Sequence, residues 1–221
     1  MLKAVLPLAP FVLPLLRGGQ GPVPVNREPL HKVVFSNEYV EVLHLVLPAG
    51  QRTLFHTHSH DGVAVRLSEA TVNVDIPGKE PTPPGAAHIG DVSAQAYAEK
   101  PMTHRVNNVG TTPFDVIDIE FLGRPAGPPT EPLATPAAEN SSARVYRWVL
   151  RQGASTPEHT HERPYLVIAA TAMHLAMKAP DGATMDHSVK AGDFHWVDAR
   201  VTHTLTNRGE ESGVLLEVEL K

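Results

Sequence analysis

The chain has 221 residues, a formal net charge of −5 at pH 7, thirteen histidines and no cysteine. That length can bury two small cores, and the mixed charges form no basic stripe, so we expect no nucleic-acid partner. The lack of cysteine excludes disulfides, thiolate metal ligands and a cysteine nucleophile.

The chain begins with an apolar run. Thirteen uncharged residues, 4–16, follow Lys3 and precede Arg17 and two glycines. This length suits the core of a signal peptide and is short for a membrane span. We therefore expect residues 1–19 to be a signal peptide, the protein to be exported or periplasmic, and no membrane association after cleavage. The alternatives are an extension from an upstream start site or an apolar arm that packs on the folded body, in either case of a cytoplasmic protein.

The remainder predicts an all-β protein in two parts. Apolar alternation marks strands in the stretches 32–50, 70–78, 114–123 and 212–221. No stretch of twelve or more residues has the pattern of an amphipathic helix. Residues 123–140 are rich in Pro and Ala, which is typical of an extended linker. We therefore expect one domain over 20–122, a linker over 123–140 and a second domain over 141–221.

The second domain is short, with only about eighty residues after the linker. We expect strands of the N-terminal segment to complete it, or the two domains to share a sheet. Fusion of this kind, or a homodimer, would cover strand edges that otherwise invite association.

One histidine pattern occurs twice, about a hundred residues apart. It consists of a glycine, five residues, His-Thr-His, then Gly-Asp, and later a histidine followed four residues on by an asparagine. Side chains alternate along a strand, so the paired histidines face one side and the third can join them from a neighbouring strand. The repeat predicts a duplicated unit with one metal site per copy. The histidines so placed are His56, His58 and His104 in the first copy and His159, His161 and His203 in the second.

These motifs resemble those of the cupin superfamily, and their duplication resembles a two-domain bicupin. "GQRTLFHTH" and "GASTPEHTH" match the front of the family's first motif, while "GDVSAQAYAEKPMTHRVNN" and "GDFHWVDARVTHTLTN" match its second. The resemblance covers roughly residues 30–221 and implies two tandem antiparallel barrels of jelly-roll type, each holding one divalent metal ion. Iron is expected first; manganese, zinc, nickel and copper are alternatives, because imidazoles accept most first-row divalent ions.

Both copies depart from the family at one position. The glutamate expected four residues after the second histidine is Gly62 in the first copy and Tyr165 in the second. Each predicted site therefore offers three imidazoles and no carboxylate, which leaves the metal its full charge and open positions for an anionic, bidentate ligand. In this respect the chain is similar to the three-histidine cupins, which include iron dioxygenases acting on thiols and on diketones.

Three further residues are candidates for the chemistry. If the strand after His56 stays regular, His60 and Arg66 face inward. His60 would then replace or hydrogen-bond a ligand, and Arg66 would hold a carboxylate or enolate beside the metal. The alternatives are a histidine in a surface loop and an arginine at the barrel rim. Tyr165 is expected to donate to the metal or its ligand, or to pack in the wall with its hydroxyl satisfied.

The other repeated and unrepeated polar residues carry weaker expectations. Asn108 and Asn207 should close turns through backbone hydrogen bonds. His195 lies on a strand leading toward His203 and is a candidate site residue. Surface or satisfied core positions are expected for the histidines without repeated partners, which are His31, His44, His88, His174 and His187.

Three functions fit this sequence. The first is an oxidoreductase, a dioxygenase, in which a small anionic substrate chelates the metal while Arg66 and Tyr165 orient it. The second is a non-redox isomerase or lyase in which the metal polarises a carbonyl group. The third is a binding protein without turnover. Oxygen chemistry relies more on the metal than on a protein acid or base, so we expect the dioxygenase.

Overall fold

The computed structural model describes residues 21–127, 131–198 and 200–221. The expected signal peptide, residues 1–19, lies outside the described residues. Regular structure in the described part is β, apart from one 3-10 turn, η1 (Val25–Arg27). Within these ranges no helix is long and apolar enough to cross a membrane. The all-β prediction is confirmed.

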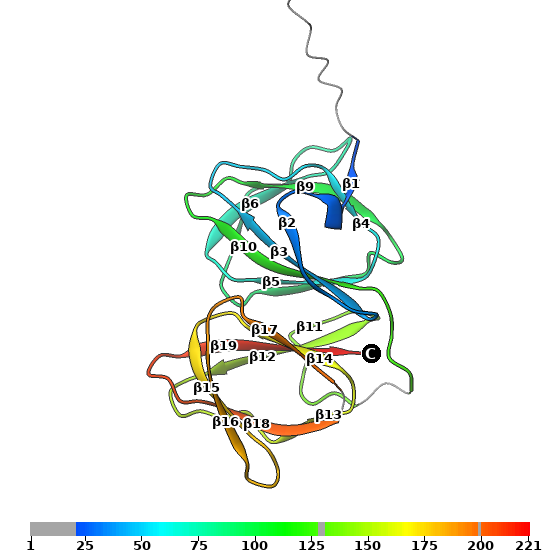
Figure 1. The fold of residues 1–221 in the computed structure, drawn as a ribbon. Helices are drawn as coiled ribbons and strands as arrows, with labels where there is room; N and C mark the ends of the chain where they lie inside the picture. Colours follow the sequence, from blue (N-terminus) through cyan, green and yellow to red (C-terminus); the bar gives the residue numbers. More distant parts are fainter. Residues whose placement is uncertain (1–20, 128–130, 199) are drawn as a thin grey trace, which may run out of the picture.

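Two five-stranded sheets form the first half of the chain (Figure 1). Their strand orders are β1-β4-β9-β6-β7 and β2-β3-β10-β5-β8. The strands of both sheets pair antiparallel except β1, which runs parallel to β4. The strands are β1 (Val23–Pro24), β2 (His31–Ser36), β3 (Val40–Leu47), β4 (His56–His58), β5 (Gly62–Arg66), β6 (Ala70–Asp75), β7 (Gly85–Ala87), β8 (Val92–Gln95), β9 (Met102–Asn108) and β10 (Phe114–Phe121).

The second half repeats this arrangement with sheets of order β11-β12-β19-β14-β17 and β13-β18-β15-β16. In the described residues no sheet mixes strands of the two halves, so the predicted sharing of a sheet or of N-terminal strands is wrong. The end of the Pro/Ala-rich stretch supplies β11 instead, which pairs with β12. The strands are β11 (Ala138–Glu139), β12 (Ala143–Leu150), β13 (His159–His161), β14 (Tyr165–Ala169), β15 (Met173–Lys178), β16 (Thr184–Val189), β17 (Phe194–Val197), β18 (Val201–Asn207) and β19 (Gly213–Leu220).

The largest apolar core lies between the two barrels. On β10, Ile117 and Ile119 point outward into this core, and on β19 Leu216 and Val218 do the same. Smaller clusters fill the two lumens, one including Val116 and the other Leu215. Because side chains alternate along a strand, the intervening residues of β10 and β19 face the lumens. β10 and β19 therefore each pack one face against the shared core and turn the other face toward a histidine cluster.

The repeated glycines set the turns that lead into the histidine strands. Gly50 and Gly153 have φ of 73° and 70°, in the left-handed region that a side chain disfavours. Each glycine N–H donates to the backbone carbonyl of the repeated asparagine, at 3.0 Å and 2.8 Å respectively. Asn108 and Asn207 also donate from their side chains to the carbonyls of Leu47 and Leu150, both at 2.9 Å. The predicted turn-closing role of the asparagines is confirmed.

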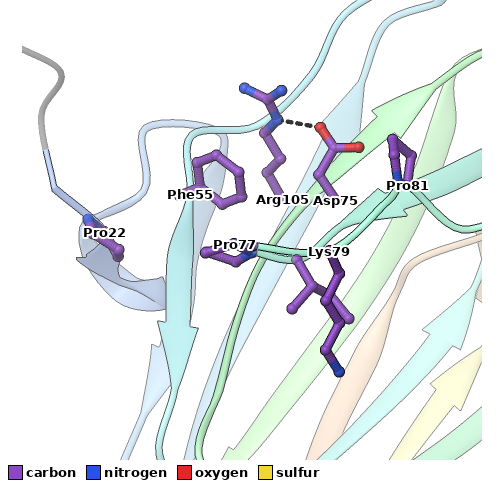
Figure 2. A pocket seen from close by; sticks show the side chains of 9 residues that line it. Pro22, Phe55, Asp75, Pro77, Lys79, Pro81 and Arg105 are labelled. Carbon is purple, nitrogen blue, oxygen red and sulfur yellow. Dashed lines mark hydrogen bonds and ion pairs between the residues drawn. The ribbon is translucent and has the colours of Figure 1, made fainter.

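A groove of about 510 Å³ lies on the outside of the first barrel (Figure 2). Its walls include Phe55 and Pro77, with the guanidinium of Arg105 4.6 Å from the centroid of the Phe55 ring. Arg105 is also ion-paired with Asp75. No histidine lines this groove, so it does not lead to the first histidine cluster.

Candidate metal centres

The first predicted histidine triad comes together in the lumen of the first barrel. His56 on β4 and His104 on β9 are antiparallel partners, and His58 lies two residues along β4. One ring nitrogen from each of the three lies within 4.8 Å of the others. The Nε2 atoms of His56 and His104 are 3.0 Å apart, so both can lie about 2.0–2.1 Å from one ion, the usual distance for imidazole.

The other ring nitrogens of this triad fix its orientation. The Nδ1 atom of His56 is 3.0 Å from the carbonyl oxygen of Leu54, and that of His58 is 2.8 Å from Glu120 Oε1. Nδ1 donating to these oxygens leaves the Nε2 lone pair for a metal. Burial lowers the pKa of His56 to about 3, aided by repulsion from His31, and burial with repulsion from His58 lowers that of His104 to about 3. Both rings are therefore neutral at pH 7, as metal ligation requires.

The N-terminal segment packs beside this triad. Val23 on β1 is the parallel partner of His56, and the buried ring of His31 lies 4.6 Å from the ring of His56, centroid to centroid. Nδ1 of His31 is 2.8 Å from Glu28 Oε2. Glu28 also accepts hydrogen bonds from the backbone N–H groups of Leu30 and Leu54. His31 thus has the satisfied core position expected for it, but its place against the triad was not predicted.

His60 does not join the first triad. Arg66 faces inward as expected, because its partner on β10 is Val116 of the lumen cluster, but it does so from the other sheet. The strand predicted to continue from His56 ends at His58, and β5 starts at Gly62 in the other sheet, so the expectation of one regular strand is wrong. The turn between them is anchored to the second half, because Asp61 accepts hydrogen bonds from Ser142 Oγ at 2.9 Å and from Ser141.

The two candidate residues have other partners. His60 is 45% exposed, and its Nδ1 lies 3.2 Å from Glu120 Oε2, the carboxylate that also orients His58. Arg66 donates to the carbonyl of Ala64 at 2.8 Å and to Ser93 Oγ at 2.6 Å. Tyr97, which sequence reasoning missed, lies nearer the triad, with its ring centroid 5.2 Å from that of His58. Burial raises the pKa of Tyr97 to about 12, so the phenol stays protonated at neutral pH.

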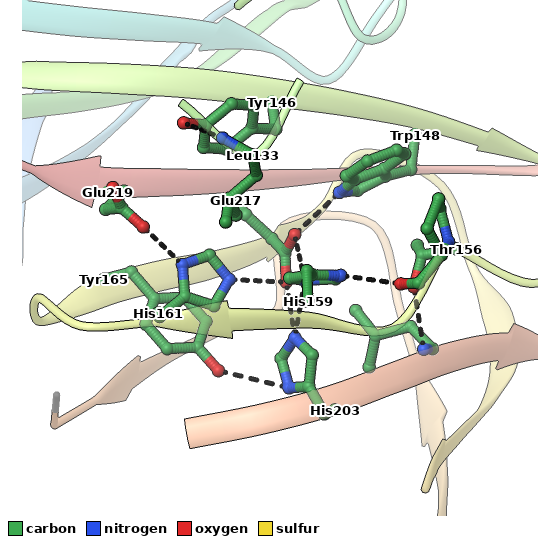
Figure 3. A network of polar contacts seen from close by, with 12 residues as sticks. Leu133, Tyr146, Trp148, Thr156, His159, His161, Tyr165, His203, Glu217 and Glu219 are labelled. Atoms are coloured by element: carbon green, nitrogen blue, oxygen red, sulfur yellow. Dashed lines mark hydrogen bonds and ion pairs between the residues drawn. The ribbon is translucent and has the colours of Figure 1, made fainter. Parts of the chain in front are cut away.

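The second predicted triad also comes together, and a carboxylate joins it (Figure 3). His203 Nε2 lies 2.9 Å from His159 Nε2 and 3.0 Å from Glu217 Oε1. His159 and His161 lie 3.2 Å and 3.4 Å from Glu217 oxygens through their Nε2 atoms. All four side chains offer one ligand atom within a common 4.8 Å. The prediction that both sites lack a carboxylate is therefore wrong for the second.

Glu217 reaches the triad from β19, not from the position where the motif would place a glutamate. Glu217 and Glu219 lie on the lumen face of β19, in register with Val167 and Tyr165 of β14. They stand 99 residues after Asp118 and Glu120 of β10, the same offset that separates His104 from His203. Acidic residues at alternate positions of two otherwise apolar strands were the signal that could have identified them.

The second cluster fits a divalent cation. Burial disfavours the charged form of Glu217, but the imidazoles of His159, His161 and His203 around it lower its pKa well below the ordinary value. Trp148 Nε1 also donates to Glu217 Oε2 at 2.7 Å. Nδ1 of His161 is 2.7 Å from Glu219 Oε2, while its buried Nε2 has only the 3.4 Å contact with Glu217 Oε1, which lacks hydrogen-bond geometry. An ion held by these donors would use that lone pair and balance the carboxylate charge.

Tyr165 packs against the ligands and orients them. It is 1% exposed, its ring stacks on that of His161 at 3.7 Å between centroids, and its hydroxyl lies 3.3 Å from His203 Nδ1. That nitrogen faces away from His159 and Glu217, which both approach Nε2 of His203. Tyr165 therefore occupies the packed wall position with a satisfied hydroxyl, which was one of the two expectations for it.

A cavity of about 620 Å³ fills the lumen beside the second cluster. His203 and Tyr165 line it at the cluster, and apolar residues of β14, β15 and β18 form its walls. His195 also lines the cavity, from the position opposite Val167 on the neighbouring strand. The lumen face of β17 thus places His195 on the cavity, although it is not one of the four clustered donors.

Comparisons with known proteins show which proteins this chain resembles. No family model matches the chain. It is 30% identical over 99 residues to the β-alanine degradation protein BauB of Pseudomonas aeruginosa, a match that covers 45% of this chain and 98% of BauB. The structure of AerE from Microcystis aeruginosa matches at TM-score 0.56 and 13% identity, covering 88% of this chain and 98% of AerE. Oxalate decarboxylase of Bacillus subtilis, which has Mn(II) centres, matches at TM-score 0.53 and 14% identity, covering 83% and 69%.

These matches agree with the two barrels and their histidine clusters. The structural neighbours share the fold over most of this chain, and the sequence relative matches a length close to one barrel. The histidine groups suit a divalent metal ion. The chain belongs to the cupin superfamily and is a bicupin with a candidate metal centre in each barrel.

Proposed function

We propose that this bicupin is a metal-dependent oxidoreductase, a dioxygenase, whose second barrel acts on a substrate with an anionic, chelating head group. The observation that carries the proposal is the 620 Å³ cavity that reaches His203, one of four clustered donors. The names of two similar proteins support a carboxylate head group, because β-alanine and oxalate are both carboxylates.

The residues of the second barrel would divide the work as follows. His159, His161, His203 and Glu217 would hold the metal, and Glu219 would keep His161 oriented. Bound iron would supply the oxygen chemistry, in which both atoms of O₂ enter the substrate and the substrate provides the electrons. The apolar cavity walls would exclude water from the reacting atoms.

Tyr165 would act as a protonated positioning residue. Burial raises its pKa, and the nearby carboxylates of Glu217 and Glu219 raise it further. The phenol therefore keeps its proton at neutral pH; its oxygen can accept from Nδ1–H of a metal-bound His203, while its O–H donates to a substrate oxygen in the cavity that both residues line.

The first barrel is the weaker candidate for turnover. Its triad lies against the N-terminal segment through His31 and β1, and Arg66 is engaged by Ala64 and Ser93. We propose that this site holds metal without taking the substrate.

A non-redox isomerase or lyase is the second candidate. The observation that favours it is the protonated phenol of Tyr165 in the cavity wall, which offers a proton donor beside a metal acting as Lewis acid. A binding protein without turnover is the third candidate.

Oxygen uptake separates these functions. Protein loaded with Fe²⁺ or Zn²⁺ would be mixed with 2,4-pentanedione or 3-mercaptopropanoate, as a diketone and a thiol carboxylate, in an oxygen electrode. We expect uptake with iron only, loss in His203→Ala and retention in His104→Ala. Product formation without oxygen uptake, with either metal, would indicate the isomerase or lyase. Binding of a probe without any product would indicate a binding protein.

A further inference from the structure

We propose that the ligand of the second barrel is amphipathic, with a carboxylate head at His203 and an apolar body of several carbon atoms along the lumen. This inference rests on the proposed function and narrows its substrate class. It assigns the body of the substrate to a surface that takes no part in holding the metal.

The cross-strand register places an apolar wall on the lumen face. On β14, Val167 and Ala169 alternate with residues of the core between the barrels. On β15, Leu175 and Met177 face the same lumen, and Met177 is the register partner of Leu205 on β18. Leu175 and Leu205 are 7% and 2% exposed. A ligand in this lumen therefore meets aliphatic and thioether groups along its length.

The volume of the cavity exceeds what a very small acid fills. A water molecule takes about 30 Å³ of liquid volume. A small acid with six non-hydrogen atoms, each counted as one water, therefore takes at most about 180 Å³. The lumen offers about 620 Å³, within the range of about 300–1,000 Å³ typical of pockets for larger organic ligands. An acid with only a few carbon atoms would leave most of the apolar wall against water, whereas an apolar body would cover it.

The polar groups of the cavity mark its two ends. His203 and Tyr165 are buried, and they line the cavity beside the metal donors. The other polar residues that line it are all exposed to solvent: His187 and Ser188 on β16, Asp193, and His195 on β17. The head group therefore has its partners at the buried end, and the solvent-exposed histidines lie at the mouth, with the apolar wall between.

A chain-length series tests the proposal without turnover. Acetate, butanoate, hexanoate and octanoate would be titrated into the Zn²⁺-loaded protein by calorimetry. Burying one methylene contributes about 0.8 kcal/mol, which is about fourfold in affinity. We expect the dissociation constant to fall about fourfold per methylene until the lumen is filled, with an increasingly negative heat-capacity change. Affinity that does not depend on chain length would overturn the proposal.

One substitution locates the apolar body. Met177→Gln keeps the length of the side chain and places an amide in the wall, so octanoate should bind about tenfold more weakly while acetate is unchanged. Met102→Gln is the matched control, because Met102 is a half-buried methionine on β9 of the first barrel, and it should leave the series unchanged. An equal loss of octanoate binding in both variants would contradict the assignment.

The outcome is separable from that of the proposed function. A flat chain-length series with iron-dependent oxygen uptake would remove the amphipathic ligand and keep the oxygenase. Affinity that rises with chain length and is weakened by the substitution of Met177 would support the amphipathic ligand, even if no oxygen is consumed.

Discussion

The two barrels hold the same histidine triad but differ by one methylene group next to it. Asp118 on β10 and Glu217 on β19 occupy equivalent lumen positions, 99 residues apart. The longer Glu217 reaches to 3.0 Å from His203 Nε2 and joins the second cluster. The shorter Asp118 is outside the first cluster, and its Oδ2 lies 4.0 Å from His31 Nε2. The two halves share the triad, and the longer side chain of Glu217 brings a fourth donor to the second one.

The acidic residues two positions further along β10 and β19 have the same role in both barrels. Glu120 and Glu219 both approach Nδ1 of the second histidine of the His-Thr-His pair, at 2.8 Å and 2.7 Å. Both therefore orient a ligand from outside the cluster, a role that typically affects metal affinity by about 10–100-fold. The comparison separates a common scaffold, three histidines and one orienting glutamate, from an added donor that is specific to the second barrel.

Removal of one histidine from either triad should have the largest effect. We expect two equivalents of metal per wild-type chain, and one equivalent in His104→Ala or His203→Ala, because each variant leaves two imidazoles at its own site. Elemental analysis after loading and desalting, on protein without a His-tag, measures this. Loss of both equivalents in one variant would show that the two sites are not independent.

Removal of the carboxylate should have a smaller effect, limited to the second barrel. Glu217→Gln keeps the side-chain shape but removes the negative charge, so we expect metal affinity there to fall by at least the roughly 10–100-fold typical of partners that only orient a ligand. Asp118→Asn is the matched control at the equivalent position and should change the affinity of the first site less than threefold. Competition with a chromophoric chelator, in the His104→Ala or His203→Ala background, measures each site alone. Equal effects of the two amides would contradict the proposed asymmetry.

Proton titration of the metal-free protein should show the smallest effect. Burial holds the pKa of His56 and His104 at about 3. Burial opposes protonation of His58 and His161, but Glu120 in one barrel and Glu217 with Glu219 in the other raise their pKa values. NMR of the histidine rings should therefore show His56 and His104 neutral at pH 5, and His58 and His161 protonated at that pH.

The two pairs should affect stability in opposite directions. The lowered pKa values of His56 and His104 mean that the unfolded chain binds more protons, so their contribution to stability is full above pH 6.5 and declines as pH falls toward 3. The raised pKa values of His58 and His161 contribute stability below pH 6.5 that is lost as pH rises through those values. Titration of all four rings near 6.5 would contradict this account of their environments.

The sequence predicted the triads because their geometry is local. His-Thr-His fixes two ligands on one face of a strand, and the repeated spacing to His104 and His203 identifies the third. The turn-closing asparagines were predictable for the same reason. Inference failed where the chain broke its period, since the turn before Gly62 moves β5 to another sheet, and Arg66 faces the lumen from that sheet.

The remaining features of the sites depend on long-range packing. Glu217 joins the second triad because β19 packs one face on the core between the barrels and turns the other to the lumen. The contact of His31 with His56 depends on the pairing of β2 with β3 and on Glu28, which is hydrogen-bonded to the His31 ring and to the backbone of Leu54. The cavity likewise arises from strands far apart in the chain, and no local signal gives its volume.

The most direct test is a crystal structure of the metal-loaded protein with anomalous diffraction data at the metal edge. The account predicts two anomalous peaks per chain. One should lie about 2.0–2.2 Å from nitrogens of His56, His58 and His104 alone, and the other at that distance from His159, His161, His203 and a Glu217 oxygen. A second peak bound by three histidines, with Glu217 turned away, would contradict the claim that the barrels differ in donor set.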